Sequence, residues 1–233
     1  MKAIMYVAHG SRLPEKNREF RAFVAKIIQK RPEPCQKIAF LEKEDETMQL
    51  VGEAMIQEGA TEITVVPMLL FPAMHATKDI PEHVANLQSA HPNVIFRIAD
   101  TFGAEPETIT TATARIRDAK PESDATILVI AHGSASYDEP RIQMQGVIAK
   151  LNAQLGHKVA LGMLHGEPNY KQVAAKLTGN VYWMPYFLFT GQLVDKIRTG
   201  INEISPNWRE TSCLELDSNL AAGVLRKIEE ATS

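Results

Sequence analysis

Three residues at the ends of predicted strands have the chemistry to hold a metal ion and to accept protons. His9 follows an apolar run at residues 3–8, Glu42 follows a second run, and His75 lies in the loop after a third. Imidazole and carboxylate groups bind divalent ions such as Fe2+, Co2+ and Ni2+, and three protein ligands leave coordination positions open. Imidazoles also accept protons near neutral pH. Together these properties suit a reaction in which a metal enters its target as protons leave.

The elements that must position these residues alternate between short β-branched runs and amphipathic helical stretches. This pattern is typical of a parallel-stranded α/β fold. In the first half it predicts strands at residues 3–8, 37–41, 62–71 and 94–98, with helices at about 20–28, 47–58, from 81 onward and at 105–117. In open sheets of this class, ligands bind beyond the carboxyl ends of the strands. We therefore expect His9, Glu42 and His75 to be neighbours in space.

The series of elements restarts after a polar segment at residues 118–124. Ala-His-Gly-Ser occurs at 8–11 and again at 131–134, and Phe-Leu-Glu at 40–42 aligns with Met-Leu-His at 163–165. A third block, 65–71, matches 183–189 in the same order. We interpret the chain as an internal duplication of two similar domains, each a four-stranded parallel sheet flanked by helices. The expected boundaries are 1–118 for the N-terminal domain with the active site, 119–124 for a linker, and 125–233 for the C-terminal domain.

The second half departs from the first at the positions that carry the chemistry. His132 is the equivalent of the first histidine, but His165 stands where the first half has its carboxylate, and Leu193 stands where it has its other histidine. A full copy of the first site cannot form without that third group, so we expect a degenerate site. Whether His132, His165 and Glu167 bind a second metal is left open.

Several further polar residues are expected to lie close to the predicted site, and one of them, Arg198, comes from the second half of the chain. Ser11 and the basic residues Arg12, Lys78 and Arg198 are predicted to hold a substrate rich in carboxylates. Asp79 has three possible roles: ordering the loop, supporting His75, or starting the helix that follows, and we expect the last. The remaining histidines are expected to lie on the surface; they are His83, His91 and His157.

Composition excludes several classes of protein. The 233 residues are 45% hydrophobic and 23% charged, as in an ordinary globular protein, and the net charge of −3 argues against a nucleic-acid-binding surface built on bulk charge. No apolar stretch reaches the roughly 18–20 residues of a membrane span. Cys35 and Cys213 lie far apart, so neither a disulfide framework nor a thiolate metal site is indicated. We expect a cytoplasmic protein with no nucleic-acid or membrane partner.

The strand-end motifs carry a resemblance to a known family. His-Gly-Ser-Arg at 9–12, Phe-Leu-Glu at 40–42 and the long block at 67–81 resemble the class II tetrapyrrole chelatases, and more narrowly the two-domain sirohydrochlorin chelatases. Pro-Asn-Tyr-Lys at 168–171 and Pro-Tyr-Phe-Leu-Phe-Thr-Gly at 185–191 resemble the second domain of the iron-inserting members. The resemblance therefore extends over nearly the whole chain.

That resemblance implies a chelatase-like fold and an enzyme that inserts Fe2+ into sirohydrochlorin to give sirohaem, with release of two protons. It implies that His9, Glu42 and His75 form the metal and catalytic site, that the metal is a substrate, and that no organic cofactor takes part. Cobalt insertion on the way to cobalamin is the alternative reaction. A monomer with two pseudo-dimeric domains is the expected assembly.

Two other interpretations use the same residues. In phosphoryl chemistry, His9 would be the nucleophile and Arg12 the phosphate clamp, but the glutamate-rich segment at 42–46 would repel a phosphate. A carrier of metal or tetrapyrrole would need the same ligands without catalysis. Only turnover distinguishes such a carrier from a chelatase.

Overall fold

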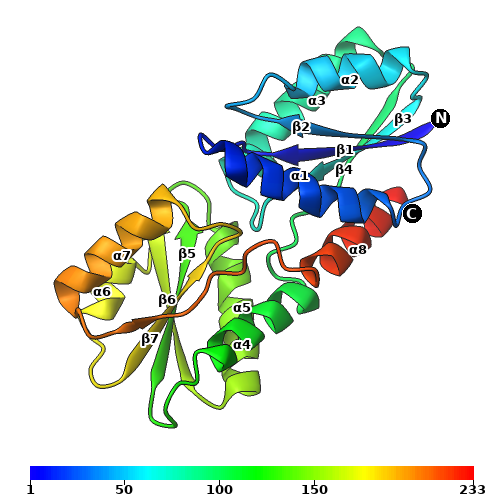
Figure 1. The fold of residues 1–233 in the computed structure, drawn as a ribbon. Coiled ribbons are helices and arrows are strands. Elements are labelled where there is room, and N and C mark those ends of the chain that lie inside the picture. The colour runs from blue at the N-terminus through cyan, green and yellow to red at the C-terminus, as the bar shows by residue number, and fades with distance from the viewer. The chain divides into compact units, whose positions relative to one another are not determined.

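The computed structural model describes all 233 residues, which divide into two compact units. The first unit comprises Met1–Gly103 and Ser218–Ser233, and the second comprises Ala104–Asp217. Each unit contains a four-stranded parallel sheet with helices on both faces (Figure 1). The predicted α/β fold class is confirmed.

The sheet of the first unit has the strand order β2-β1-β3-β4. Its strands are β1 (Lys2–Ala8), β2 (Cys35–Phe40), β3 (Glu62–Pro67) and β4 (Ile95–Ile98). Its helices are α1 (Pro14–Ile28), α2 (Met48–Gln57), a π-helix η1 (His75–Asp79), α3 (Ile80–Ala90) and α8 (Leu220–Thr232). The direction of connection reverses between β1 and β3, so the carboxyl ends of these central strands form the usual ligand crevice of such a sheet.

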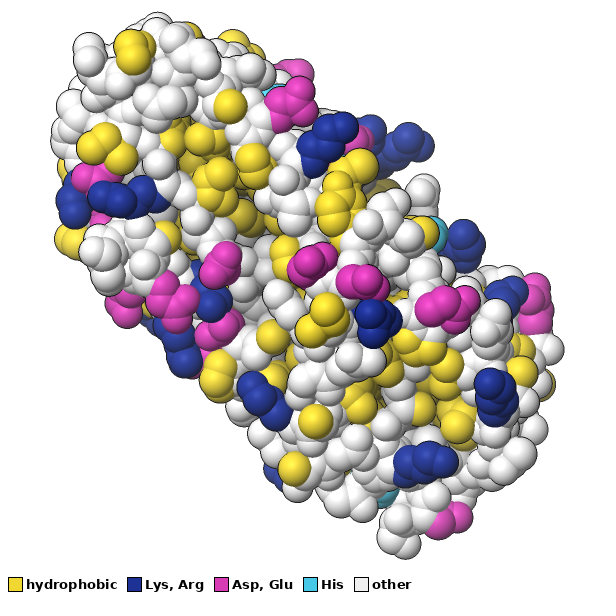
Figure 2. Space-filling model, turned by 180° about the vertical axis from the view of Figure 1, so that it is seen from behind, with side chains coloured by type: hydrophobic (Ala, Val, Ile, Leu, Met, Phe, Trp, Pro, Cys, Tyr) yellow, Lys and Arg dark blue, Asp and Glu magenta, His cyan; other side chains and the backbone are white.

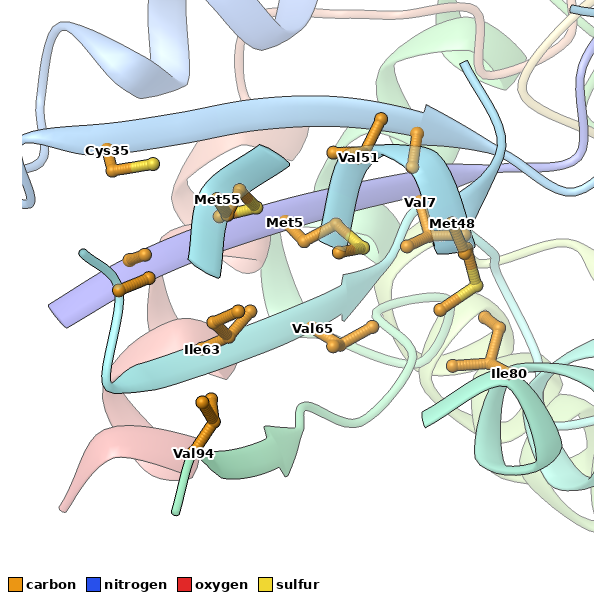
Figure 3. Close-up of a cluster of buried hydrophobic side chains, with 13 residues drawn as sticks. Met5, Val7, Cys35, Met48, Val51, Met55, Ile63, Val65, Ile80 and Val94 are labelled. Atoms are coloured by element: carbon orange, nitrogen blue, oxygen red, sulfur yellow. The ribbon is translucent and has the colours of Figure 1, made fainter. Parts of the chain in front are cut away.

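Both faces of β1 are buried, as its uninterrupted apolar sequence predicts. One face, which includes Met5 and Val7, packs against α2 and α3 through an apolar cluster that Figure 3 shows in close-up. Gly59 ends α2 in the left-handed region with φ of +95°, as predicted. The parallel register of β1 with β2 and β3 aligns the carboxyl ends of these three strands, and therefore the residues that follow them.

The second unit repeats the same plan, with strand order β6-β5-β7-β8. Its strands are β5 (Thr126–Gly133), β6 (Lys158–His165), β7 (Val181–Tyr186) and β8 (Arg209–Glu210). Its helices are α4 (Pro106–Asp118), α5 (Glu139–Leu155), α6 (Tyr170–Ala174) and α7 (Gln192–Ile204). The strand β8 has only two residues, which is too short to produce a periodic signal in the sequence.

The last helix of each repeat belongs to the unit of the other repeat, which the predicted boundaries at 118 and 125 did not anticipate. Helix α4 lies in the second unit, where it packs on α5, and α8 lies in the first unit, where it packs on α1 and β3 (Figure 1). Leu220, Val224 and Ile228 of α8 have no exposed surface. The hydrophobic stripe of such a helix predicts burial but does not identify the sheet on which the helix packs, so sequence alone did not assign it.

The surface carries charges of both signs. On the face drawn in Figure 2, basic and acidic side chains are interspersed, and hydrophobic side chains lie between them. Both cysteines are buried and free. No helix of the structure combines the length and apolar character that crossing a membrane would require.

Replacing Ile228 by alanine tests the placement of α8. The side chain is fully buried, so we expect a loss of about 2–5 kcal/mol in the free energy of unfolding. Hydrogen exchange should show weaker protection of amides in β3 and β4, the strands on which α8 packs. The control Ile142→Ala, at a position 55% exposed, should cost about 0.5 kcal/mol or less. A loss of protection confined to β5 and β7 would instead place α8 on the second sheet.

Candidate metal-binding site

The candidate site begins where β1 and β2 stop pairing as regular strands. Two further backbone hydrogen bonds continue the ladder: Leu41 N–H donates to Ala8 O at 2.9 Å, and Glu42 N–H donates to His9 O at 2.9 Å. His9 and Glu42 are therefore held side by side by the main chain. The two strand ends are therefore adjacent, as predicted.

Gly10 is the residue that permits this approach. Its φ is +91°, and a Cβ atom placed on it would lie 1.9 Å from the carbonyl oxygen of Glu42. Any side chain here would force the two strand ends apart as well as strain the backbone. The glycine of the His-Gly-Ser-Arg motif is thus a requirement for bringing His9 next to Glu42.

His9 and His75 face each other across the end of the sheet. Their ring centroids are 4.6 Å apart and their planes are inclined by 77°. Nδ1 of His9 lies 3.0 Å from Gly10 O. Because a carbonyl oxygen only accepts, Nδ1 carries the proton and Nε2 keeps its lone pair. The arrangement leaves His9 with one nitrogen free to bind a metal or accept a proton.

His75 is held in the same tautomer by a carboxylate. Nδ1 of His75 lies 2.6 Å from Oδ2 of Asp79, one turn later in the π-helix η1. A ring N–H that donates to a carboxylate leaves Nε2 as the ligand nitrogen and raises its basicity. Asp79 was expected mainly to start the following helix, but it contacts His75 directly.

Glu42 contributes a negative charge to the site. Its side chain is 44% exposed, and Oε2 lies 2.6 Å from Nζ of Lys43. The pKa of the Glu42 carboxyl is lowered by this hydrogen bond first, then by the nearby His9 and the charge of Lys43, and more weakly by His75. Glu42 is therefore ionised and close to both imidazoles. However, its carboxylate is turned to Lys43, and no group of three or more His, Cys, Asp or Glu residues is arranged to hold a metal ion.

The predicted substrate-binding residues fall into two groups. Arg12 and Lys78 are exposed beside the histidines. The Oγ of Ser11 accepts from Leu13 N–H at 3.1 Å and orders the loop. Arg198 does not fit its predicted role, because its guanidinium is already paired with Asp195 and with both oxygens of Glu210, at 2.6 and 2.8 Å.

Asn17 is a residue of the site region that sequence reasoning missed. It is buried, its Oδ1 accepts from Ser11 N–H at 2.9 Å, and its Nδ2 donates to Ser11 O at 2.8 Å. Nδ2 also donates to Glu44. Asn17 thereby ties α1 to the loop that follows His9. A lone asparagine in an amphipathic helix gives no sequence signal for such a contact, apart from its place on the buried stripe.

The other histidines lie outside the site. Nε2 of His91 lies 2.7 Å from Oε2 of Glu53, on the face of the first sheet that α2 and α3 cover. Nδ1 of His157 lies 3.2 Å from Ala125 O, at the amino end of the second sheet. His83 is half-buried on α3. None of them joins the histidine pair.

The second sheet carries an incomplete equivalent of the site. The rings of His132 and His165 are 5.0 Å apart and inclined by 57°. Burial, the neighbouring His132 and Lys196 lower the pKa of His165. Oε2 of Glu167 accepts from Asn169 N–H at 2.9 Å. The third group proposed for a second metal site is thus engaged in its own loop.

Fold and site together define a two-unit α/β protein that presents paired imidazoles at the strand ends of each sheet. The family model described as CbiX matches residues 3–119 and again residues 126–231. The chain belongs to the CbiX family. This confirms the resemblance inferred from the strand-end motifs.

Individual relatives agree over the length of the chain. The sirohydrochlorin ferrochelatase of Bacillus subtilis (strain 168) is 30% identical, covering 100% of this chain and 92% of that protein. The sirohydrochlorin ferrochelatase of Priestia megaterium is 31% identical, covering 88% and 80%. A solved structure described as SirB from Bacillus subtilis with Fe3+ superimposes with a TM-score of 0.89 at 29% identity, covering 100% and 96% of the two chains.

Replacing Gly10 by alanine tests the close approach of the strand ends. Gly59→Ala is a matched control, because Gly59 has φ of +95° but no atom within 4 Å of the added Cβ. The control should cost about 1–2 kcal/mol from its left-handed backbone alone. Gly10→Ala should cost more in urea unfolding and also weaken Co2+ binding. Equal destabilisation by the two substitutions would contradict the steric argument.

Replacing Asp79 by asparagine tests its role as the partner of His75. Loss of the charged acceptor should weaken metal affinity about 10- to 100-fold, as is usual for such partners. Asp79→Glu keeps a carboxylate at this position and should therefore retain more of the metal affinity than Asp79→Asn does. Glu82→Gln removes an exposed charge from the same helix start without touching His75, and it should leave metal affinity unchanged. Equal affinities for Asp79→Asn and wild type, measured by calorimetry, would rule this role out.

Proposed function

We propose that this protein is a sirohydrochlorin ferrochelatase, which inserts Fe2+ into sirohydrochlorin and releases two protons. The observation that carries the proposal is the pair of facing imidazoles, His9 and His75, each with Nδ1 engaged and Nε2 available. Whole-length similarity to the ferrochelatases of Bacillus subtilis and Priestia megaterium supports iron as the metal and sirohydrochlorin as the macrocycle. Cobalt insertion is the less favoured alternative.

In this proposal, Fe2+ is a substrate held by His9 and His75, with the Glu42 carboxylate as the third ligand. Two neutral imidazoles and one carboxylate leave the ion with coordination positions for the incoming macrocycle. The carboxylate must turn from Lys43 toward the ion, and since its side chain is largely in solvent, this rotation costs little. The negative charge of Glu42 offsets half of the charge of the ion.

The reaction exchanges protein ligands for macrocycle nitrogens. Two of the four macrocycle nitrogens carry N–H protons, and both protons must leave as the nitrogens bond to Fe2+, which balances the charge of the ion. Nitrogen lone pairs freed on His9 and His75, and the carboxylate of Glu42, lie within the site to accept these protons. The protein supplies position and proton acceptance, and the macrocycle supplies the final ligands.

Exposed side chains beside the histidines suit a large, flat, acidic substrate. Leu13 and Met74, which is the residue before His75, are 44% and 49% exposed. Apolar side chains at these positions can pack against the flat face of a macrocycle and so remove apolar surface from water. Arg12 and Lys78 are free to pair with carboxylates of the macrocycle. We retain these two, with Ser11, as substrate-binding residues and omit Arg198.

The proposal also assigns the working site to the first repeat and treats the chain as a cytoplasmic monomer. Duplication places two related units in one chain, so a single chain contains the two copies that a dimer would take from two chains. The unequal ligand sets of the repeats support a single insertion site.

An anaerobic insertion assay tests the function. Catalytic amounts of protein should convert many equivalents of sirohydrochlorin to the metallated product, followed by absorbance, with Fe2+ giving the highest kcat/KM among Fe2+, Co2+ and Ni2+. His9→Ala and His75→Ala should each lower the rate about 10²- to 10⁴-fold. His91→Ala removes a histidine outside the site and should insert at the wild-type rate.

Two results would overturn the proposal. Binding of a single equivalent of macrocycle without turnover would identify a carrier. Wild-type rates in both His9→Ala and His75→Ala would show that insertion takes place elsewhere.

A further inference from the structure

The second repeat keeps a histidine pair that the insertion reaction does not use. His132 lies near the end of β5 and His165 ends β6, and these strands pair in parallel with Gly133 opposite His165. The ring centroids are 5.0 Å apart, close to the 4.6 Å of the pair in the first repeat. The pairing of neighbouring strands fixes both imidazoles at one edge of the sheet.

The same glycine contact holds this pair together. Gly133 has φ of +67°, and a Cβ atom on it would lie 2.2 Å from the carbonyl oxygen of His165. Nδ1 of His132 lies 2.9 Å from Gly133 O, so Nδ1 carries the proton and Nε2 is available. Neither ring nitrogen of His165 has a hydrogen-bond partner. Each histidine therefore offers a nitrogen lone pair.

The remaining surroundings supply no further protein ligand. The ring of Phe187 lies 6.4 Å from that of His132, edge to face, and closes one side with apolar surface. Leu193, 40% exposed, occupies the sequence position equivalent to the third ligand of the first repeat. Any ion bound here has two imidazoles and otherwise water.

We propose that His132 and His165 form a second metal-binding site, made of imidazoles alone, which takes late first-row divalent ions. Imidazole suits Cu2+, Ni2+, Co2+ and Zn2+, and affinity for nitrogen ligands rises from Fe2+ through Co2+ and Ni2+ to Cu2+. Without a carboxylate the site has no charge to offset the ion, so it discriminates by the strength of the metal–nitrogen bond. Of the ions in this series, Fe2+ has the lowest affinity for such a pair of imidazoles. The site is independent of the insertion reaction.

Lys196 offers a further test of the proposal, because its positive charge opposes metal binding by His132 and His165. Its ammonium group is close enough to His165 to influence that residue electrostatically. A cation near a bound divalent ion weakens binding, and removing it should strengthen binding. Lys196→Met should therefore tighten Ni2+ binding roughly two- to fivefold at low salt, and less at high salt.

The test uses the full chain with the first site disabled by His9→Ala and His75→Ala. Calorimetric titration with Ni2+ should show one ion bound per chain in this background. Adding His132→Ala or His165→Ala should lower the affinity by at least about tenfold, since losing even a supporting residue of a metal ligand costs about 10- to 100-fold. His157→Ala, which removes a histidine at the other end of the same sheet, should leave the titration unchanged. Circular dichroism confirms folding of each variant.

A spectroscopic measurement identifies the ligands directly. Substoichiometric Cu2+ added to the same background should first broaden the NMR imidazole signals of His132 and His165. Broadening of His83 or His91 first would overturn the proposal. Equal Ni2+ titrations with and without His132 and His165 would also overturn it, and neither result would bear on insertion by the first repeat.

Discussion

The site depends on how closely two parallel strands approach after their regular pairing ends. Between β1 and β2 the ladder continues for two more hydrogen bonds, as far as His9 and Glu42, and this is possible only because Gly10 has no side chain to meet the Glu42 carbonyl. Because this backbone contact continues the sheet, it holds the residues that follow the strands more firmly than a loop would. His75 is then the one group of the set that reaches the site from a less regular segment. Its position is secured by Asp79 and by the π-helix that contains both residues.

The second repeat preserves this contact while changing the side chains that it positions. Gly133 approaches the His165 carbonyl just as Gly10 approaches that of Glu42, and Nδ1 of His132 and of His9 each bond to the carbonyl of the following glycine. The geometry of the strand ends is thus a property of the fold, shared by both copies. Chemistry differs between them because it resides in the residue types at these fixed positions. This is why the duplication was detectable in the sequence even though the ligand sets are unequal.

Features with a periodic or local signal were predictable from the sequence. The strands, most helices, the left-handed Gly59 and the meeting of His9 with His75 all follow from hydrophobic period and from parallel strands ending at one edge. Features that depend on a choice between distant partners were not predictable. The hydrophobic stripe on α8 does not identify the sheet on which it packs, and the pairing of Arg198 with Glu210 depends on a strand of two residues. In each case the residue type was recognised but its partner was not.

The contrast between the repeats is the reason that the proposed function assigns insertion to the first of them. At the first repeat, the ionised Glu42 carboxylate lies close to both imidazoles, and once it turns from Lys43 it would partly neutralise a bound ion. At the second repeat, the carboxylate is replaced by the neutral ring of His165, and Lys196 adds a positive charge. An ion there would be held by metal–nitrogen bonds alone, with no carboxylate to offset its charge or to share in accepting the protons of a macrocycle. Replacement of one carboxylate by an imidazole thus removes the charge that would offset the ion and one of the proton acceptors that the proposed reaction uses.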